Sequence, residues 1–161
     1  MIGHNDDTAS GVKWQTRCKL PAPDRINLYL HDRRTGSTKL VSRQSKGAGG
    51  DGANGSATSA SLSNSGRYIT FQTDATNLGG PIMSSLNSYV YDRERERATL
   101  VSRAGGGGPG ANEYAGEPAI AGDGKFVAFY TPADNIDPPG QPAYHGNFPA
   151  ATNVYRFQFA P

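Results

Sequence analysis

Short runs of alternating apolar and polar residues, separated by turn residues, recur along the chain. At residues 12–18, Val12, Trp14, Thr16 and Cys18 alternate with charged or amide side chains, the period-2 pattern of a half-buried strand. Residues 26–32 and 38–43 read as two antiparallel strands joined by a turn that contains Gly36. The pattern therefore predicts β-strands from near the start of the chain.

The most apolar strands are predicted at residues 67–72 and 125–130. In the first, Tyr68 points to one face of the strand, and Ile69 and Phe71 point to the other. The second repeats this arrangement with Phe126, Val127 and Phe129. Apolar groups on both faces predict a sheet that is covered on both sides.

Shorter strands with small side chains precede these two, at residues 58–63 and 117–121. Glycine-containing turns at 64–66 and 122–124 join each short strand to its apolar neighbour. Such tight hairpins need glycine or asparagine at positive φ. Small side chains suit an innermost strand, where sheets converge and space is least.

The strands belong to an internal repeat. Leu40-Val41-Ser42-Arg43 returns as Leu100-Val101-Ser102-Arg103 at an offset of 60 residues, and Tyr29 and Asp32 return as Tyr89 and Asp92. Residues 65–71 match 123–129, and 75–78 match 133–136, at an offset of 58. Residues 58–103 form one complete unit of four short strands, flanked by partial copies. A repeat of this length built from strands predicts radially repeated sheets.

Composition and charge exclude several functional classes. The chain has 161 residues, 35% hydrophobic, with 21 glycines and 11 prolines, which suits an all-β protein with many turns. Its net charge of +2 comes from interspersed residues, so no nucleic acid partner is expected. No apolar run approaches the ~18 residues of a membrane span, and residues 1–7 lack the apolar core of a signal peptide. No membrane association is expected.

Two local features invite a chemical interpretation that the sequence does not support. Cys18 is the only cysteine; no Cys-His signature surrounds it, so we expect a small residue that packs inward rather than a nucleophile. The glycine-rich segment 44–57 lacks the terminal Gly-Lys-Ser/Thr of a phosphate-binding loop and a following helix. It is predicted to be a long surface connection.

The repeat resembles that of TolB-like β-propellers, a WD-like repeat of bacterial propellers. The resemblance covers about residues 26–158 and rests on three groups of residues. They are the Gly-Arg/Lys-aromatic-Ile/Val-x-Phe run followed by Ala-x-Asn-Leu/Ile, the Tyr-Val-Tyr-Asp-Arg run, and Leu-Val-Ser-Arg. It implies blades of four antiparallel strands, with a partial blade at 26–43, a complete blade at 58–103 and a partial blade at 117–158. Residues 1–25 would be an N-terminal segment with one strand. Members of this family are often periplasmic or secreted, and localisation stays open.

About two and a half blades make an incomplete ring, since closed propellers have 4 to 8 blades. Open sheet edges are templates for association. We therefore expect a homo-oligomer, with two or three chains completing the ring. A fragment of a longer propeller, or a smaller sandwich that closes on itself, is the alternative.

The resemblance places the long connections 44–57, 73–86, 104–116 and 131–151 on one face, which we call the long-loop face. The first functional hypothesis is a binding module that recognises a protein, glycan or small-molecule ligand there. Its candidate ligand-binding residues are Tyr114, Tyr144, His145 and Phe148.

The second hypothesis is a metal-dependent hydrolase of esters or phosphoesters. Oxygen-bearing side chains from successive blades could hold a calcium-type ion at the axis once the ring closes. The candidate ligands are Asp51, Asn54, Asn112 and Glu113. No Ser-His-Asp order, zinc spacing or close carboxylate pair is present, so no catalytic residue is assigned.

Overall fold

The computed structural model describes residues 24–136 and 153–158, and within these ranges the protein is all-β. The strands are β1 (Tyr29–Asp32), β2 (Ser37–Leu40), β3 (Ala57–Leu62), β4 (Tyr68–Thr73), β5 (Asn87–Asp92), β6 (Arg97–Leu100), β7 (Gly116–Ile120), β8 (Phe126–Thr131) and β9 (Asn153–Gln158). Two 3-10 turns, η1 (Lys46–Ala48) and η2 (Gly105–Gly107), interrupt the long connections. The predicted all-β character is confirmed. The strand predicted at residues 12–18 lies outside the described residues.

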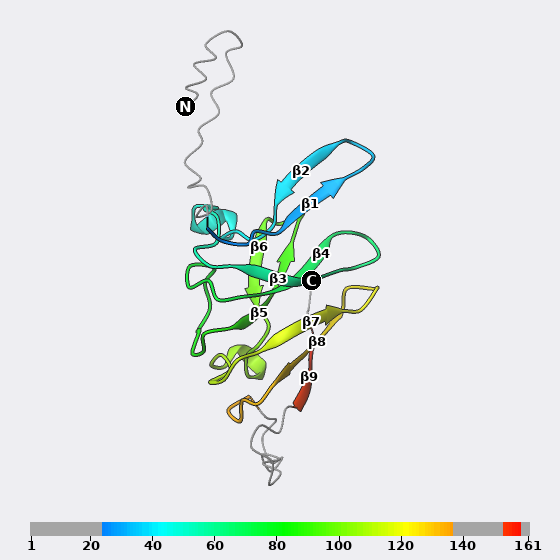
Figure 1. The fold of residues 1–161 in the computed structure, drawn as a ribbon. Coiled ribbons are helices and arrows are strands. Elements are labelled where there is room, and N and C mark those ends of the chain that lie inside the picture. The colour runs from blue at the N-terminus through cyan, green and yellow to red at the C-terminus, as the bar shows by residue number, and fades with distance from the viewer. Residues whose placement is uncertain (1–23, 137–152, 159–161) are drawn as a thin grey trace.

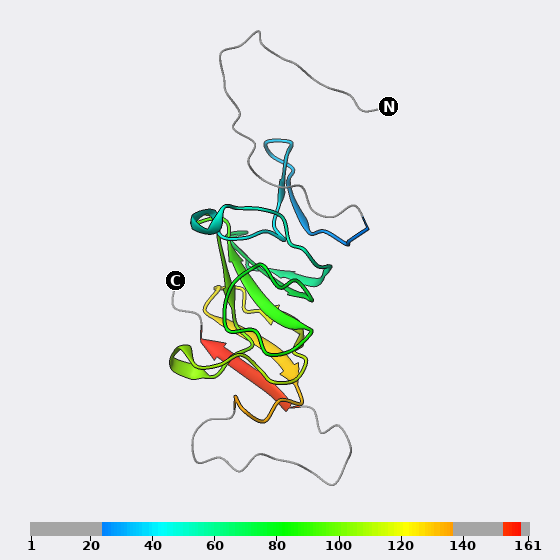
Figure 2. The same ribbon diagram turned by 90° about the vertical axis from the view of Figure 1, so that its left-hand side faces the viewer.

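The strands form three antiparallel sheets in chain order. The first sheet pairs β1 with β2, the second has the order β3-β4-β5-β6, and the third has the order β7-β8-β9. Figures 1 and 2 show the sheets stacked one after another along the molecule, with the four-stranded sheet between the other two. Each described strand pairs only with strands of its own sheet. The sheets are joined by side-chain packing, by the connecting loops and by single hydrogen bonds, such as the one from the Thr70 hydroxyl to the Pro118 carbonyl at 3.1 Å.

The first hydrophobic cluster lies between the first and second sheets. Leu28, Leu30 and Val41 contribute from the first sheet and its flanks, and Ile69 and Phe71 contribute from β4. Its remaining members are Ala53, Ala57, Ala75, Leu78, Ile82, Tyr89, Tyr91, Ala98 and Leu100. Buried apolar area of this kind stabilises by about 25 cal/mol per Å², so this packing is the main attachment of the two-stranded sheet.

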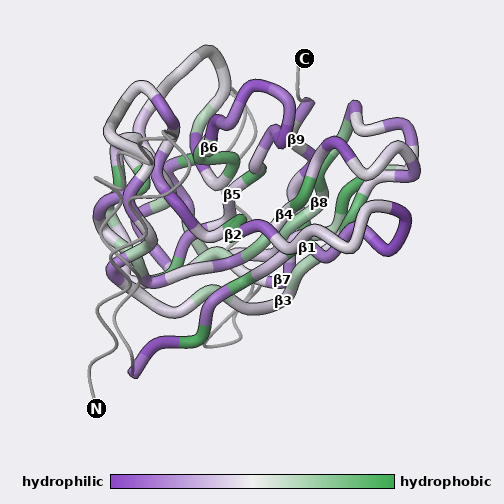
Figure 3. The backbone as a smooth tube through the Cα atoms, turned by 90° about the horizontal axis from the view of Figure 1, so that it is seen from above, coloured by the Kyte–Doolittle hydropathy of each residue, from purple (hydrophilic) through white to green (hydrophobic). Residues whose placement is uncertain are grey.

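The second cluster, between the second and third sheets, repeats the first. Val90, Val101, Val127 and Phe129 occupy the places of Leu30, Val41, Ile69 and Phe71, at the offsets of 60 and 58 seen in the sequence. Tyr68 faces this cluster from the opposite side of β4. All six residues of β5 are buried. The second sheet is therefore covered on both faces, as its apolar pattern predicted, and the hydrophilic stretches lie mainly in the loops (Figure 3).

An aromatic pair recurs across neighbouring strands. Phe71 stands opposite Tyr89 in the register of β4 and β5, and their rings stack at 6.0 Å and 17°. Phe129 and Tyr155 repeat this on β8 and β9, at 6.0 Å and 20°. The Tyr89 hydroxyl donates to the carbonyl of Gly79 at 2.8 Å, and burial raises the pKa of Tyr89 to about 12.

The first strands of the second and third sheets, β3 and β7, carry matching irregularities. The register shifts between Thr58 and Ser61 and again between Gly116 and Ala119. Within these bulges Ser59 and Glu117 adopt φ values of 51° and 48°, which non-glycine residues rarely adopt. A bulge bends and twists its strand, so β3 and β7 bend at corresponding places. In the tight turns beyond them, Gly66 and Gly124 have φ of 69° and 76°, as predicted.

We predict that Phe71→Ala and Phe129→Ala each lower the free energy of unfolding by about 3 to 5 kcal/mol. Both side chains are almost fully buried, at 0% and 3% exposure, so each truncation removes apolar contacts from a packed cluster. Chemical denaturation followed by circular dichroism measures the change. Ile26→Ala is the control, because its side chain is 61% exposed and should contribute less than about 0.5 kcal/mol. A loss well below 1 kcal/mol at both phenylalanines would contradict the packing described here.

Candidate functional site

The two long connections that follow β2 and β6 share one backbone arrangement. The N–H groups of Ala53 and Ala111 donate to the carbonyls of Ser42 and Ser102, each at 2.9 Å. The Ser42 and Ser102 hydroxyls accept from the N–H groups of Leu28 and Ser88, each at 3.1 Å. Arg43 and Arg103 donate from their guanidinium groups to loop carbonyls, including Gly50 and Gly108 at 2.8 Å. The repeated Leu-Val-Ser-Arg run thus supplies a buried valine and two residues that fix the loop.

Asparagine pairs tie each of these connections to the loop that follows the next strand pair. The Asn54 N–H donates to the Asn77 side-chain oxygen at 2.9 Å, and the Asn77 amide donates to the Gly52 carbonyl at 2.9 Å. Asn112 and Asn135 repeat this, with Asn135 donating to Gly110 at 2.8 Å. The described parts of these long connections are therefore held in place by polar contacts between loops.

The candidate metal ligands take part in this framework. The Asn54 side chain donates to the Thr76 hydroxyl and accepts from the Thr76 N–H, both at 2.8 Å. The Asn112 amide donates to Asp134 at 2.8 Å. A cation at Asn54 would therefore have to share or displace a bond that its side-chain oxygen already makes.

Asn54 and Asn112 stand at corresponding places in two successive loops. Asp51 is half-buried, and Glu113 is exposed. Within residues 24–136 and 153–158, no three His, Cys, Asp or Glu side chains are grouped closely enough to hold a metal ion. The assignment of Asp51, Asn54, Asn112 and Glu113 to a metal stays a prediction.

Tyr114 is the candidate ligand-binding residue that the structure describes. Its side chain is 37% exposed, and its ring meets the Tyr130 ring edge-on at 6.0 Å and 77°. Two residues before it, Asn112 is anchored to Asn135, so the tyrosine projects from a fixed segment. Tyr144, His145 and Phe148 lie outside the described residues.

Met83 is a second exposed apolar side chain near these loops, and the sequence analysis did not select it. It is 58% exposed, and its sulfur lies 3.9 Å from the Asn135 amide nitrogen. Asn135 is the same residue that anchors Asn112. Met83 therefore lies beside the asparagine that anchors Asn112, two residues before Tyr114. Ile82 and Leu86 lie in the same segment, so the sequence did not distinguish Met83 as an exposed side chain.

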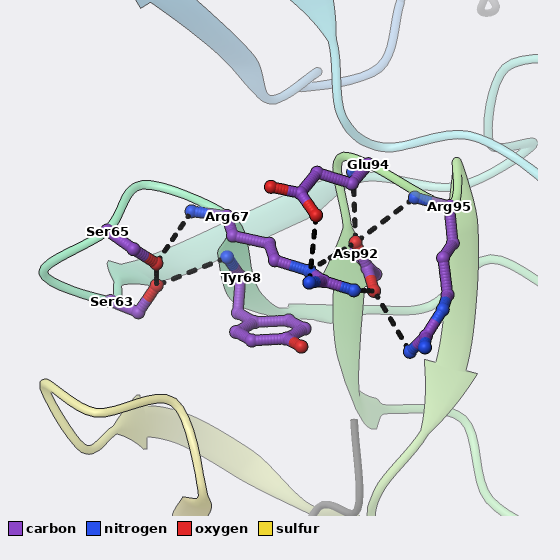
Figure 4. Close-up of polar contacts among 7 residues, drawn as sticks. All are labelled: Ser63, Ser65, Arg67, Tyr68, Asp92, Glu94 and Arg95. Atoms are coloured by element: carbon purple, nitrogen blue, oxygen red, sulfur yellow. Dashed lines mark hydrogen bonds and ion pairs between the residues drawn. The ribbon is translucent and has the colours of Figure 1, made fainter.

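At the opposite end of the sheets, an ion-pair cluster around the buried Asp92 joins the turn before β4 to the turn after β5 (Figure 4). Arg67 donates to both carboxylate oxygens of Asp92, at 3.1 and 2.8 Å, and reaches Glu94 at 2.8 Å. Asp92 also accepts from the N–H groups of Glu94 and Arg95 at 2.9 and 3.2 Å. The arginine lies over the Tyr68 ring at 5.0 Å, a favourable cation–π position.

The charge state of the pair follows from these contacts. Burial alone would raise the pKa of the Asp92 carboxyl, but the hydrogen bonds from Arg67 and from the N–H groups of Arg95 and Glu94 outweigh it and hold the pKa below 3.8. The hydrogen bond to Asp92 raises the pKa of Arg67. Both groups are charged at neutral pH, and Asp92 accepts hydrogen bonds on both oxygens, so the pair has a structural role.

We predict that Asp92→Asn lowers the free energy of unfolding by about 2 kcal/mol at pH 7, because it removes the charge from the buried partner of Arg67 and leaves this arginine with only the exposed carboxylate of Glu94. A folded-state pKa below the unfolded value stabilises the fold above pH 3.8, and this contribution is lost as pH falls through the folded pKa. Urea unfolding should therefore show a constant difference from wild type between about pH 5 and 7 that shrinks below about pH 4.

The matched control is Glu94→Gln, which removes a carboxylate from the same arginine. The Glu94 side chain is 58% exposed, so its ion pair should contribute less than about 1 kcal/mol. Equal losses for Asp92→Asn and Glu94→Gln, or a difference that persists unchanged below pH 3, would contradict the assigned role of Asp92.

Two further findings bear on function. Among the residues that the structure describes, no helix is long and apolar enough to cross a membrane. Compared with known proteins, the chain matches no family model, and a search of curated proteins returned no significant match.

Proposed function

We propose that the protein is a non-catalytic binding module that takes a protein or glycan ligand on its long-loop face. The observation that carries the proposal is Tyr114, an exposed aromatic residue braced edge-on by Tyr130 and held by the anchored Asn112. Tyrosine supplies a large amphipathic contact at low entropic cost and is enriched among the residues that dominate binding energy. Met83 adds an adaptable apolar contact beside the same loop.

Two carboxylates in the described parts of the long connections support binding over catalysis. The Asp74 carboxylate accepts from the Ser56 N–H at 2.6 Å, and Asp134 accepts from the Asn112 amide at 2.8 Å. General acid-base chemistry needs a titratable group aimed at a substrate, whereas these carboxylates are directed to the loops themselves. A loop backbone that is already held in place also reduces the conformational entropy that is lost when a ligand binds.

The three sheets are, in this proposal, parts of a β-propeller-type ring. The four-stranded sheet is one blade, and the two smaller sheets are portions of the blades on either side. Support comes from the two hydrophobic clusters, which repeat each other position by position between successive sheets. Two or three chains complete the ring, since closed rings have 4 to 8 blades.

The binding proposal is tested by screening the protein against an array of defined glycans and a displayed peptide library, then measuring the best ligand by calorimetry. Tyr114→Ala should weaken that ligand about 30-fold or more, as expected for a residue that dominates binding. Leu62→Ala is the control, because it removes an exposed apolar side chain at the end of β3, beside the short turn at residues 64–66 and away from the long connections. Equal affinities for wild type and Tyr114→Ala would refute the proposed role of Tyr114.

The ring is tested by the solution mass from light scattering, repeated after chelator treatment with bound metal quantified on the same sample. The chain has a mass of 17.0 kDa, and two or three times this value is expected. A monomer would contradict completion by further copies. Calcium that co-purifies and is lost in Asn112→Ala would favour the alternative, a metal-dependent hydrolase with Asp51, Asn54, Asn112 and Glu113 as ligands.

A further inference from the structure

Among the described residues, the first sheet has an open edge at the place where the second and third sheets have a further strand. β5 is hydrogen-bonded to β4 on one side and to β6 on the other, and β9 is bonded to β8. β1 occupies the place of β5, yet among the described strands it pairs only with β2. The other edge of β1 presents backbone N–H and C=O groups. The equivalent edges of β5 and β9 are paired with β4 and β8.

The aromatic residue on this edge lacks the partner that its counterparts have. Tyr29 corresponds to Tyr89 at the offset of 60, and Tyr89 is fully buried against Phe71. Tyr29 is 55% exposed. In the third sheet Tyr155 has the same place and stacks on Phe129. The two complete examples show which residue Tyr29 is missing, an aromatic side chain on an adjacent antiparallel strand.

The sequence ahead of β1 contains a third segment that matches the residues of β4 and β8. Residues 12–16, Val-Lys-Trp-Gln-Thr, align with Ile-Thr-Phe-Gln-Thr at 69–73 and Val-Ala-Phe-Tyr-Thr at 127–131. Trp14 takes the place of Phe71 and Phe129. Two residues after the shared threonine, Cys18 stands where the repeats have Ala75 and Ala133, both 1% exposed.

We propose that the open edge of β1 is the docking surface for residues 12–16 of the same chain. The segment adds antiparallel to β1, with Trp14 opposite Tyr29 and Val12 opposite His31, as Phe71 stands opposite Tyr89 and Ile69 opposite Tyr91. The docking is independent of the function proposed above. Residues 1–23 lie outside the described part of the chain, so the assignment rests on the β1 edge and on the two complete copies.

The register and the connection are both compatible with this assignment. A slip of one residue would turn Trp14 to the opposite face of the sheet, so stacking on Tyr29 fixes a single register. Ten residues separate Thr16 from Asn27, against 13 between Thr73 and Asn87. The connection is therefore similar in length to the one that joins β4 to β5.

Fluorescence of Trp14, the only tryptophan, tests the contact. We expect blue-shifted emission and acrylamide quenching several-fold weaker than for free indole. Tyr29→Ala should shift the emission to the red and restore quenching, whereas Leu62→Ala, a change at another exposed apolar position, should not. Tyr29 is itself exposed, so the variant is expected to fold, and circular dichroism verifies this. Emission like that of free indole in the wild-type protein would overturn the proposal.

A disulfide test checks the register and checks that both segments belong to the same chain. In a Cys18→Ala background, chosen because alanine occupies this position in both described copies, Val12→Cys with His31→Cys should form an intrachain disulfide on mild oxidation. Facing residues of antiparallel strands have Cα atoms about 4.5 to 5.5 Å apart, within the range that a disulfide spans.

The matched control is Gln15→Cys with His31→Cys, which displaces the first cysteine by three residues, about 10 Å along a strand. It should not cross-link, because disulfides need Cα atoms closer than about 7 Å. Equal cross-linking of both pairs, or of neither, would refute the register. A disulfide found only between two chains, seen as a dimer on a non-reducing gel, would refute docking within one chain.

Discussion

Two-sided burial of the four-stranded sheet is the constraint on which the rest of the structure depends. Its strand β5 has six buried residues in succession, which no single sheet could cover by itself, because alternate side chains point to opposite faces. One face requires the first sheet, through Leu30 and Val41, and the other requires the third, through Val127 and Phe129. Since both contacts use the same residue types at the same offsets, each sheet stacks on the next in the same way. The sheets therefore form a series, and each end of the described series has one uncovered face.

The hydrogen bonding of the connecting loops follows from the distance between stacked sheets that each loop has to cross. A chain that leaves β2 or β6 must cross to the next sheet while satisfying its backbone N–H and carbonyl groups, which cannot be left unpaired when buried. Ser42 and Ser102 do this beside the core, and the Asn54–Asn77 and Asn112–Asn135 pairs do it near the surface. Most polar side chains in these loops are thus committed to the fold. The side chains available to a ligand are the exposed ones on these hydrogen-bonded loops. The proposed function therefore rests on Tyr114 rather than on a polar residue.

Local patterns were sufficient to predict the strands, because the period-2 alternation and the Gly66 and Gly124 turns are properties of short segments. The repeat offsets also indicated which residues share an environment. They did not indicate what those residues contact. Asn54 was selected as a metal ligand, and its bonds to Thr76 and Asn77 could not be inferred, since they join segments more than 20 residues apart. Arg67 and Asp92 were both within recognised repeats, but their ion pair depends on the register of β4 with β5. Met83 could be recognised only once Asn135 had been placed beside it.

One aspartate occurs at the same place in two copies of the repeat. Comparing the two copies shows which contacts a hairpin makes by itself and which contacts need a neighbouring strand. Asp32 and Asp92 begin equivalent turns, and each accepts hydrogen bonds from the backbone N–H groups two and three residues later. The backbone N–H of Arg34 is the main reason that the pKa of Asp32 is lowered, and this needs only the turn itself. Asp92 acquires the Arg67 guanidinium in addition, because β4 lies beside β5. Ser10 stands where Arg67 would be if residues 12–16 align with 69–73. A strand added at β1 would then complete the sheet through backbone pairing and the aromatic stack, while the turn at Asp32 would keep the form that it already has without it.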